Sequence, residues 1–157
     1  MDNELFELAR QLGRLLKLNG KKIATAESCT GGWIAQIITE VPGSSAWFDR
    51  GFVTYSDAAK MELLGVKPET LDQFGAVSAQ TASEMANGAL AHSNAGCAIA
   101  VTGIAGPDGG TIDKPVGTVF IAWALKNKGV KVVQQKLTGN RREIRCQTVK
   151  MALEGVD

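Results

Sequence analysis

The sequence contains a single histidine, and this scarcity excludes several kinds of active site. His92 is the only histidine among 157 residues. A Ser-His-Asp triad would need it, but it falls near the end of an expected surface helix, with no neighbours typical of a site. A histidine-rich zinc site is excluded by the same count. We therefore expect His92 to be an ordinary surface residue, and any nucleophile to use a different base.

Cysteines and long apolar runs are also scarce. The three cysteines are odd in number and lack metal-ligand spacing, so they indicate free thiols in a reducing cytosol, without a disulfide or a metal site. No apolar stretch approaches the length of a membrane span, and the acidic start at residues 1–4 is unlike a signal peptide. We expect a cytoplasmic protein without a membrane partner.

Excess charge is absent as well. The formal net charge is +1, and the largest basic cluster, Arg141, Arg142 and Arg145, is too small to cover a nucleic-acid duplex. We therefore expect no nucleic-acid partner. With 45% hydrophobic residues, the chain has the length and composition of one globular domain spanning residues 1–157.

Hydrophobic periodicity and turn residues predict alternating helices and strands. The expected helices cover about 3–19, 30–40, 56–64, 68–74, 78–93 and 142–153. The expected strands cover about 22–26, 51–55, 97–101, 116–125 and 130–137, the last two as an antiparallel hairpin. This order predicts an α/β fold, a three-layer α/β/α sandwich with a mixed sheet. Because ligands of such sheets lie beyond the carboxyl ends of strands, we expect Ser28, Tyr55 and Thr102 to converge there.

The stretch 24–32 is the most informative part of the sequence. It predicts a strand that turns at once into a helix, where free N–H groups and the helix dipole favour an anion. Ser28 on this turn is a nucleophile, a phosphate-binding hydroxyl or only a helix cap. Thr30 can act as the cap instead, which leaves Ser28 free. Gly31 and Gly32 suit a backbone that approaches a ligand closely or donates to an oxyanion.

Without histidine, Lys60 is the best candidate for the base that activates Ser28. A lysine acts in this way when burial keeps it neutral near pH 7. The alternative is a solvated lysine on a short surface helix. Cys29 is a rival nucleophile because thiols at helix N-termini are reactive, but without a histidine partner it is expected to point into the core.

A glycine-rich loop follows the strand at 97–101 and supplies further candidates. Residues 102–110 resemble a phosphate cradle but lack the order of residues of a P-loop. Arg141 and Arg145 can bind a phosphate through their guanidinium groups, or they can simply face solvent.

Several longer blocks of sequence resemble one known family, the CinA C-terminal domain family. The matching blocks are residues 25–32, 51–56 with Lys60, 64–66, 75–78, 102–110 and 114–119. They cover nearly the whole chain in order. The chain departs from the usual family pattern at Asn140, where the family has aspartate before the arginines.

The resemblance implies an amidohydrolase that converts the carboxamide of nicotinamide mononucleotide to nicotinate mononucleotide and ammonia, in pyridine-nucleotide salvage. It implies Ser28 as nucleophile and Lys60 as its partner, with Tyr55 and Thr102 lining the site, a homodimer, and no required metal or cofactor. An alternative is a non-catalytic nucleotide-binding or regulatory module, because such domains are also linked to competence and DNA-damage responses. Hydrolysis of another amide is a third possibility.

Combining this chemistry with the turn gives each candidate residue a role. We expect N–H groups of Cys29, Thr30 and Gly31 to hold the oxyanion, and Tyr55 to position Lys60 or the amide. Ribose phosphate would be bound by Thr102, by the loop from Gly103 to Gly106, and by Arg141 or Arg145. Three roles are considered for Glu27: it orders Lys60 by hydrogen bonding, it orders Thr30 in the same way, or it stabilises the helix N-terminus.

Overall fold

A computed structural model of the chain describes residues 2–156. Its five strands form one sheet in the order β2-β1-β3-β4-β5. The strands are β1 (Ile23–Glu27), β2 (Phe48–Val53), β3 (Cys97–Gly103), β4 (Thr118–Leu125) and β5 (Gly129–Lys136). β1 runs parallel to β2 and β3, whereas β4 is antiparallel to both β3 and β5. The expected mixed sheet with a late hairpin is confirmed.

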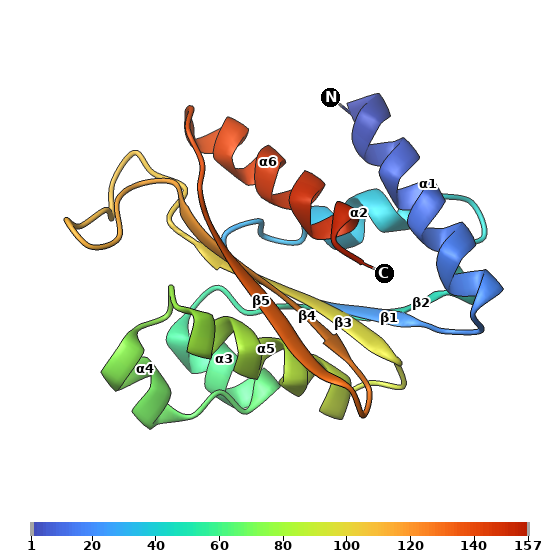
Figure 1. The fold of residues 1–157 in the computed structure, drawn as a ribbon, viewed down its shortest axis with the longest axis horizontal. Coiled ribbons are helices and arrows are strands. Elements are labelled where there is room, and N and C mark those ends of the chain that lie inside the picture. The colour runs from blue at the N-terminus through green and yellow to red at the C-terminus, as the bar shows by residue number, and fades with distance from the viewer. Residues whose placement is uncertain (1, 157) are drawn as a thin grey trace.

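Helices cover both faces of this sheet (Figure 1). One layer holds α1 (Asp2–Leu18), α2 (Trp33–Thr39) and α6 (Arg141–Glu154). The other holds α3 (Asp57–Leu64), α4 (Pro68–Phe74) and α5 (Ala79–Ala91). A short 3-10 helix, Ser44–Ala46, precedes β2. The expected three-layer α/β/α sandwich is therefore confirmed.

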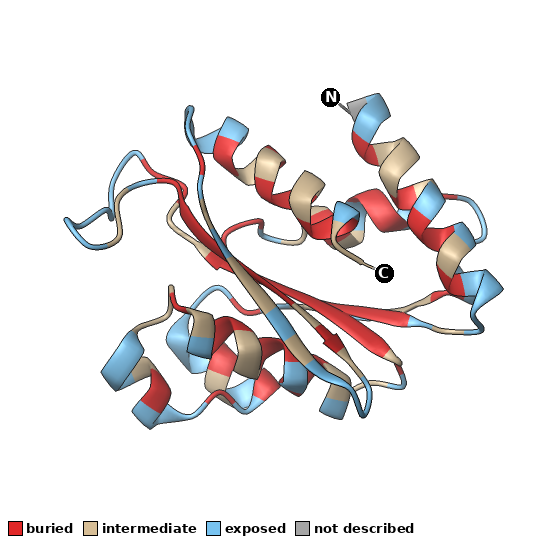
Figure 2. Ribbon diagram, in the orientation of Figure 1, coloured by how far each residue is buried: buried red, intermediate tan, exposed pale blue. Residues whose placement is uncertain are grey.

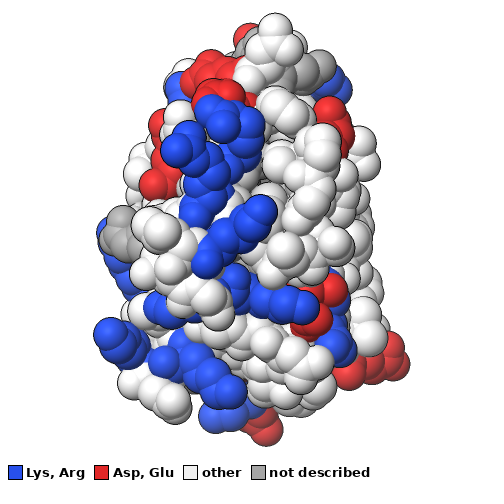
Figure 3. All heavy atoms as spheres, turned by 90° about the vertical axis from the view of Figure 1, so that its right-hand side faces the viewer, with Lys and Arg blue, Asp and Glu red and all other residues white. Residues whose placement is uncertain are grey.

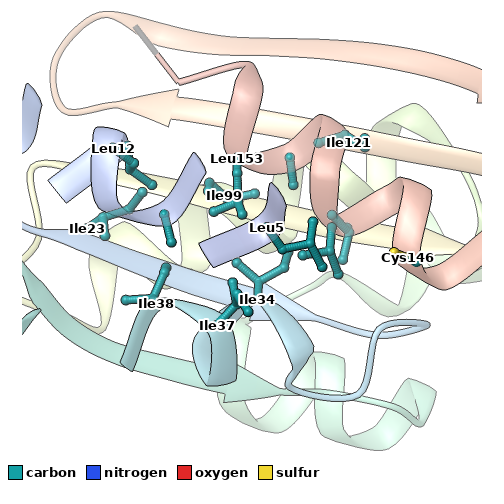
Figure 4. Close-up of a cluster of buried hydrophobic side chains, with 14 of the residues drawn as sticks. Leu5, Leu12, Ile23, Ile34, Ile37, Ile38, Ile99, Ile121, Cys146 and Leu153 are labelled. Atoms are coloured by element: carbon teal, nitrogen blue, oxygen red, sulfur yellow. The ribbon is translucent and has the colours of Figure 1, made fainter. Parts of the chain in front are cut away.

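The two faces of the sheet carry side chains of different size. Towards α1, α2 and α6 the central strands present large residues such as Ile23, Ile99 and Ile121, which pack with leucines and isoleucines of the helices (Figure 4). Towards α5 they present mostly alanine, for example Ala24, Ala98 and Ala100, with alanines of the helix opposite. β1 and β3 are almost wholly buried (Figure 2), as expected for strands covered on both sides. Because alanine is small, α5 lies close to the sheet on this face.

Two expected boundaries were wrong. β2 begins at Phe48 and ends at Val53, rather than covering residues 51–55. It is an edge strand with half-exposed residues, so its apolar pattern is weak at its start. The helix expected from residue 30 begins only at Trp33, because Gly31 and Gly32 have φ angles of 61° and 104°, outside the right-handed helical region.

The end of the molecule at the start of β1 carries many of the basic residues. There the Lys22 carbonyl accepts from Gly96, and the Gly96 carbonyl accepts from Lys126. Figure 3 shows lysine and arginine side chains gathered on this end, with aspartate and glutamate at the margins. The carboxyl end of β1, with Ser28, lies at the other end of the strand. Within residues 2–156 no helix combines the length and apolar character needed to cross a membrane.

Candidate functional site

The site is built on the turn that connects β1 to α2. The Ser28 N–H donates to the Val101 carbonyl of β3 at 3.1 Å, which extends the parallel pairing by one residue. The Gly31 N–H then donates back to the Ser28 carbonyl at 3.1 Å and closes the turn. Ser28 is thereby fixed at the carboxyl end of the central strands, where an α/β sheet places its ligands.

Glu27 caps the helix that follows the turn. Its buried carboxylate accepts from the Thr30 hydroxyl at 2.6 Å and from the N–H groups of Ile34 and Ala35 at 2.8 and 3.0 Å. The expectation that Thr30 caps this helix was wrong. The cap position is occupied by Gly32, which has no side chain to accept a hydrogen bond. Of the three readings for Glu27, ordering of Thr30 and stabilisation of the helix N-terminus are both found. The carboxylate has no hydrogen bond with Lys60 among the described residues.

Lys60 reaches Ser28 from the opposite layer. Ser56 caps α3 by accepting from the Ala59 N–H at 3.0 Å, and Lys60 follows in the first turn of this helix. The Lys60 side chain is 1% exposed, and its Nζ lies 3.0 Å from Ser28 Oγ. Nζ also donates to the carbonyls of Thr54 at 2.8 Å and Tyr55 at 3.3 Å. The reading of Lys60 as a solvated surface residue is therefore wrong.

No carboxylate neutralises Lys60. Across residues 2–156 the ion pairs join Arg10 to Glu7, Arg50 to Asp49 and Lys150 to Glu4, and none includes Lys60. Burial lowers the pKa of the Lys60 ammonium below its ordinary value, against opposing effects of Asp57 and Cys29. The environment thus favours a neutral amine far more than water does.

The three contacts of Lys60 match the hydrogen-bonding capacity of that neutral amine. An ammonium has three donors and no acceptor, whereas a neutral amine has two N–H donors and one lone pair. The carbonyls of Thr54 and Tyr55 take the two N–H groups. When Lys60 is neutral, its lone pair is left for the Ser28 hydroxyl 3.0 Å away, which is the contact that a general base needs.

Ser28 and Lys60 open into a cavity of about 180 Å³. The cavity is lined by Ser28, Cys29, Tyr55, Lys60, Ala76, Val77, Thr102, Gly103, Ala105 and Arg141. The expected convergence of Ser28, Tyr55 and Thr102 at one edge of the sheet is thus observed. Thr30, Gly31, Gly106 and Arg145 do not line the cavity.

Tyr55 and Arg141 form the rim. The Tyr55 side chain is exposed, and its hydroxyl accepts from Arg141 Nη2 at 3.1 Å. Arg141 Nη1 also donates to the Gly106 carbonyl at 2.7 Å, which ties the glycine-rich loop to the start of α6. Tyr55 contacts Lys60 through its main-chain carbonyl. Its aromatic side chain therefore lies where it can contact a ligand in the cavity.

Thr102 and Gly103 form the wall beneath the glycine-rich loop. The Thr102 side chain is buried and its hydroxyl donates to the Ala76 carbonyl at 2.8 Å, so it links β3 to the segment between α4 and α5. At Gly103 a Cβ atom would come within 2.7 Å of Val119, so a larger residue would push β3 away from β4. Both residues shape the cavity, although the hydroxyl of Thr102 is already engaged.

Cys29 is buried, as expected, whereas Arg145 contacts the main chain and not the cavity. Burial raises the pKa of the Cys29 thiol to about 12, so the thiolate needed for a nucleophile is scarce near neutral pH. Arg145 points its guanidinium at the main chain of the turn, with Nε 3.0 Å from the Cys29 carbonyl and Nη2 3.1 Å from the Thr30 carbonyl.

Ala76 and Val77 line the cavity but were not predicted as site residues, whereas Ala105, which also lines it, belongs to the predicted loop from Gly103 to Gly106. They offer main-chain and small apolar surface, which carries no chemical signature in a sequence. The only available signal was that residues 75–78 form one of the blocks that resemble the family. Among residues 2–156, no group of three or more histidine, cysteine or acidic side chains is arranged to hold a metal ion.

Curated proteins similar to this chain are bacterial. One from Enterobacter agglomerans, named nicotinamide-nucleotide amidohydrolase PncC, is 52% identical over 98% of this chain and 93% of its own length. A protein of the same name from Escherichia coli strain K12 is 50% identical over the same shares. A putative competence-damage inducible protein from Acetivibrio thermocellus is 53% identical over 96% of this chain, which corresponds to 36% of that longer protein.

Solved structures agree with these similarities. A competence/damage inducible protein from Agrobacterium tumefaciens superimposes with a TM-score of 0.94 at 52% identity, covering 96% of this chain and 92% of the other. A competence damage-inducible protein A from Klebsiella pneumoniae gives a TM-score of 0.92 at 38% identity, with the same coverage. Residues 5–157 match the CinA C-terminal domain. The chain therefore belongs to the CinA C-terminal domain family.

Proposed function

We propose that this protein hydrolyses the carboxamide of nicotinamide mononucleotide to nicotinate mononucleotide and ammonia, with Ser28 as nucleophile and Lys60 as general base and acid. The observation that carries the proposal is the 3.0 Å contact between Ser28 Oγ and a buried Lys60 Nζ, which forms no ion pair with a carboxylate of residues 2–156. The names of the curated relatives support the same reaction, and they confirm the expected class of enzyme, an amidohydrolase.

The first half of the reaction forms an acyl-enzyme. Ser28 Oγ attacks the carboxamide carbon while its proton passes to Lys60 Nζ. The carbonyl oxygen becomes an oxyanion, which main-chain N–H groups of the turn stabilise. When the tetrahedral intermediate collapses, Lys60 gives the proton to the nitrogen and ammonia leaves. The carbonyl carbon is now an ester of Ser28.

The second half repeats these steps with water. Lys60 removes a proton from a water molecule, which attacks the ester carbon. Collapse of the second intermediate returns the proton to Ser28 Oγ and releases the carboxylic acid product. One water molecule is consumed for each ammonia released, and both groups return to their starting state.

The proposed substrate suits a lysine base. Its pyridinium ring is permanently cationic, which makes the carboxamide carbon electron-poor and easier to attack. A positive charge close to Lys60 also disfavours the ammonium form of the side chain, in the same direction as burial does. Tyr55 and Arg141 at the rim are the proposed contacts for the ribose phosphate, together with the glycine-rich loop from Gly103 to Gly106.

The test is ammonia release from nicotinamide mononucleotide by the wild type, Ser28→Ala and Lys60→Ala, each checked for folding by circular dichroism. We expect turnover by the wild type and a loss of at least about 1,000-fold in both variants. A folded Ser28→Ala variant with turnover near that of the wild type would exclude the mechanism. If the wild type binds nucleotides but releases no ammonia, the alternative of a regulatory nucleotide-binding module gains support. The homodimer and the cytoplasmic location remain predictions.

A further inference from the structure

Arg145 of α6 binds the main chain of the turn that carries Ser28. It is half-buried, and it binds two successive carbonyls, those of Cys29 and Thr30, at 3.0 and 3.1 Å. It also stacks over the Trp33 ring, with Cζ 5.5 Å from the ring centroid. These contacts use the planar fork of the guanidinium and orient it towards the protein.

A bond to a carbonyl also fixes the N–H group that shares its peptide plane. In a trans peptide the C=O of one residue and the N–H of the next point in opposite directions within one plane. By holding the Cys29 carbonyl, Arg145 therefore sets the direction of the Thr30 N–H. In the same way, the bond from Gly31 N–H to the Ser28 carbonyl sets the direction of the Cys29 N–H.

These two N–H groups are the donors that remain available on the turn. Within the described residues, the N–H groups of Ser28 and Gly31 already donate to Val101 and Ser28. Those of Cys29 and Thr30 donate to no carbonyl or side-chain oxygen of the same residues, and the Cys29 N–H interacts only with the sulfur of its own side chain. They directly follow the nucleophile in the chain, where an acyl-transfer site needs its oxyanion donors.

We propose that Arg145 is a positioning residue for the oxyanion donors and that it does not bind the substrate phosphate. This inference rests on the proposed amide hydrolysis. It assigns Arg145 a different role from Arg141, which lines the cavity and contacts the rim. Loss of Arg145 frees the peptide plane between Cys29 and Thr30 and lowers the rate of the chemical step, while substrate binding is retained.

The experiment compares Arg145→Ala and Arg145→Lys with Arg142→Ala. Arg142 is a matched control because it lies on the same helix with Cζ 5.0 Å from the Trp33 centroid, yet has no hydrogen bond to the turn within residues 2–156. Steady-state ammonia release is measured with nicotinamide mononucleotide and with nicotinamide riboside, which lacks the phosphate. We expect Arg145→Ala to lower kcat by roughly 10- to 100-fold with both substrates and to change KM by less than about threefold.

Arg145→Lys is expected to recover little of this loss, because an ammonium cannot span two carbonyls as the guanidinium fork does. The control Arg142→Ala is expected to keep kcat within about twofold of the wild type. A loss that falls on KM for the mononucleotide and vanishes with the riboside would identify Arg145 as a phosphate ligand and overturn the proposal. An unchanged kcat in Arg145→Ala would overturn it too.

A second measurement does not depend on turnover. Hydrogen–deuterium exchange of the peptide covering residues 27–35 is compared between the wild type, Arg145→Ala and Arg142→Ala. We expect faster exchange in Arg145→Ala alone, because the bonds that close the turn lose their support. Equal exchange in all three proteins would overturn the positioning role even if nicotinamide mononucleotide proved not to be the substrate. Absence of ammonia release by the wild type, with faster exchange in Arg145→Ala, would instead reject only the proposed function.

Discussion

The two sides of the turn that carries Ser28 hold buried charged groups of opposite kinds. Glu27 accepts from N–H groups of α2, and Lys60 is a residue of α3; each is 1% exposed. Each makes three hydrogen bonds. Taking such groups out of water is costly unless partners compensate, so both are under strong physical constraint.

The hydrogen-bond partners of Glu27 and Lys60 differ, and this difference indicates a structural role for Glu27 and a catalytic role for Lys60. All three partners of Glu27 are donors, so its carboxylate form satisfies them and has nothing left to exchange. Two partners of Lys60 are carbonyls and the third is a hydroxyl, so its neutral form satisfies them and can accept the hydroxyl proton. We therefore expect removal of Glu27 to damage mainly folding, and removal of Lys60 to damage mainly activity.

The largest expected effect is that of Lys60→Met. Methionine fills a similar volume without a charge, so we expect ammonia release to fall by at least about 1,000-fold, or roughly 4 kcal/mol in the activation barrier. The free energy of unfolding, measured with urea, should stay within about 1 kcal/mol of the wild type, because methionine fills the same buried volume without an amine that must be desolvated. Lys67→Met, an exposed lysine before α4, is the control. A large loss of stability in Lys60→Met would mean that both sides of the turn are structural.

Glu27→Ala should show the reverse pattern in stability. It leaves the Thr30 hydroxyl and the N–H groups of Ile34 and Ala35 without their acceptor, and we expect a loss of about 3 kcal/mol. That corresponds to a fall in Tm of roughly 6–12 °C for a chain of this size, measurable by calorimetry. Glu27→Gln should lose less, since an amide oxygen still accepts. The exposed Glu62→Ala on α3 serves as control, and an equal Tm for it and Glu27→Ala would refute the capping role.

The pH dependence of the wild type should report the proton of Lys60. Because only the neutral amine accepts the serine proton, kcat/KM should rise about tenfold per pH unit below the Lys60 pKa and level off above it. Burial lowers this pKa, so the midpoint should lie below the ordinary lysine value of 10.5. A kcat/KM that stays flat from pH 6 to 10 would argue against Lys60 as the base.

The same pKa change has a defined sign in stability. Since the folded protein holds the Lys60 proton less tightly than the unfolded chain, stability rises with pH between the folded pKa and 10.5. The buried cysteines act in the opposite direction above pH 9.0, because burial raises the pKa of Cys29 to about 12 and that of Cys97 to about 11. Comparing urea titrations of the wild type and Lys60→Met separates the effect of Lys60 from that of the cysteines, which both proteins share. The contribution of Lys60 should be missing in Lys60→Met.

The sequence predicted which residues meet at this site better than it predicted the hydrogen bonds between them. Ser28, Tyr55 and Thr102 could be predicted to converge because each follows a strand, and counting histidines led to Lys60. Two of the three roles considered for Glu27 are found, but the contacts of Arg145 with the carbonyls of Cys29 and Thr30 could not be predicted, because they depend on how the folded turn directs its backbone groups. Thr30 looked like a helix cap because it precedes the apolar repeat, but the positive φ angles of Gly31 and Gly32 move the helix start to Trp33.

The same limit applies to the fold. Periodicity predicted the layers, since the strands and helices of a sandwich repeat with different periods. It could not predict that β2 starts at Phe48, because an edge strand with half-exposed residues lacks a clear pattern. Nor could it predict the cavity wall at Ala76 and Val77, where small apolar side chains contribute shape and no reactive group.

The smallest expected effect is that of His92→Ala, which removes the only histidine of the sequence. His92 is exposed at the end of α5, and its ring Nδ1 contacts only the Gly88 carbonyl, at 2.8 Å, among the described residues. We expect kcat/KM to stay within about twofold and the free energy of unfolding within about 0.5 kcal/mol of the wild type. The decisive measurement is the pH profile: if its midpoint is the same in His92→Ala, the titrating group is not the histidine. If the midpoint shifts in His92→Ala, the pH dependence of kcat/KM would belong to His92 and not to Lys60. The contrast between a structural Glu27 and a catalytic Lys60 would then lose its support.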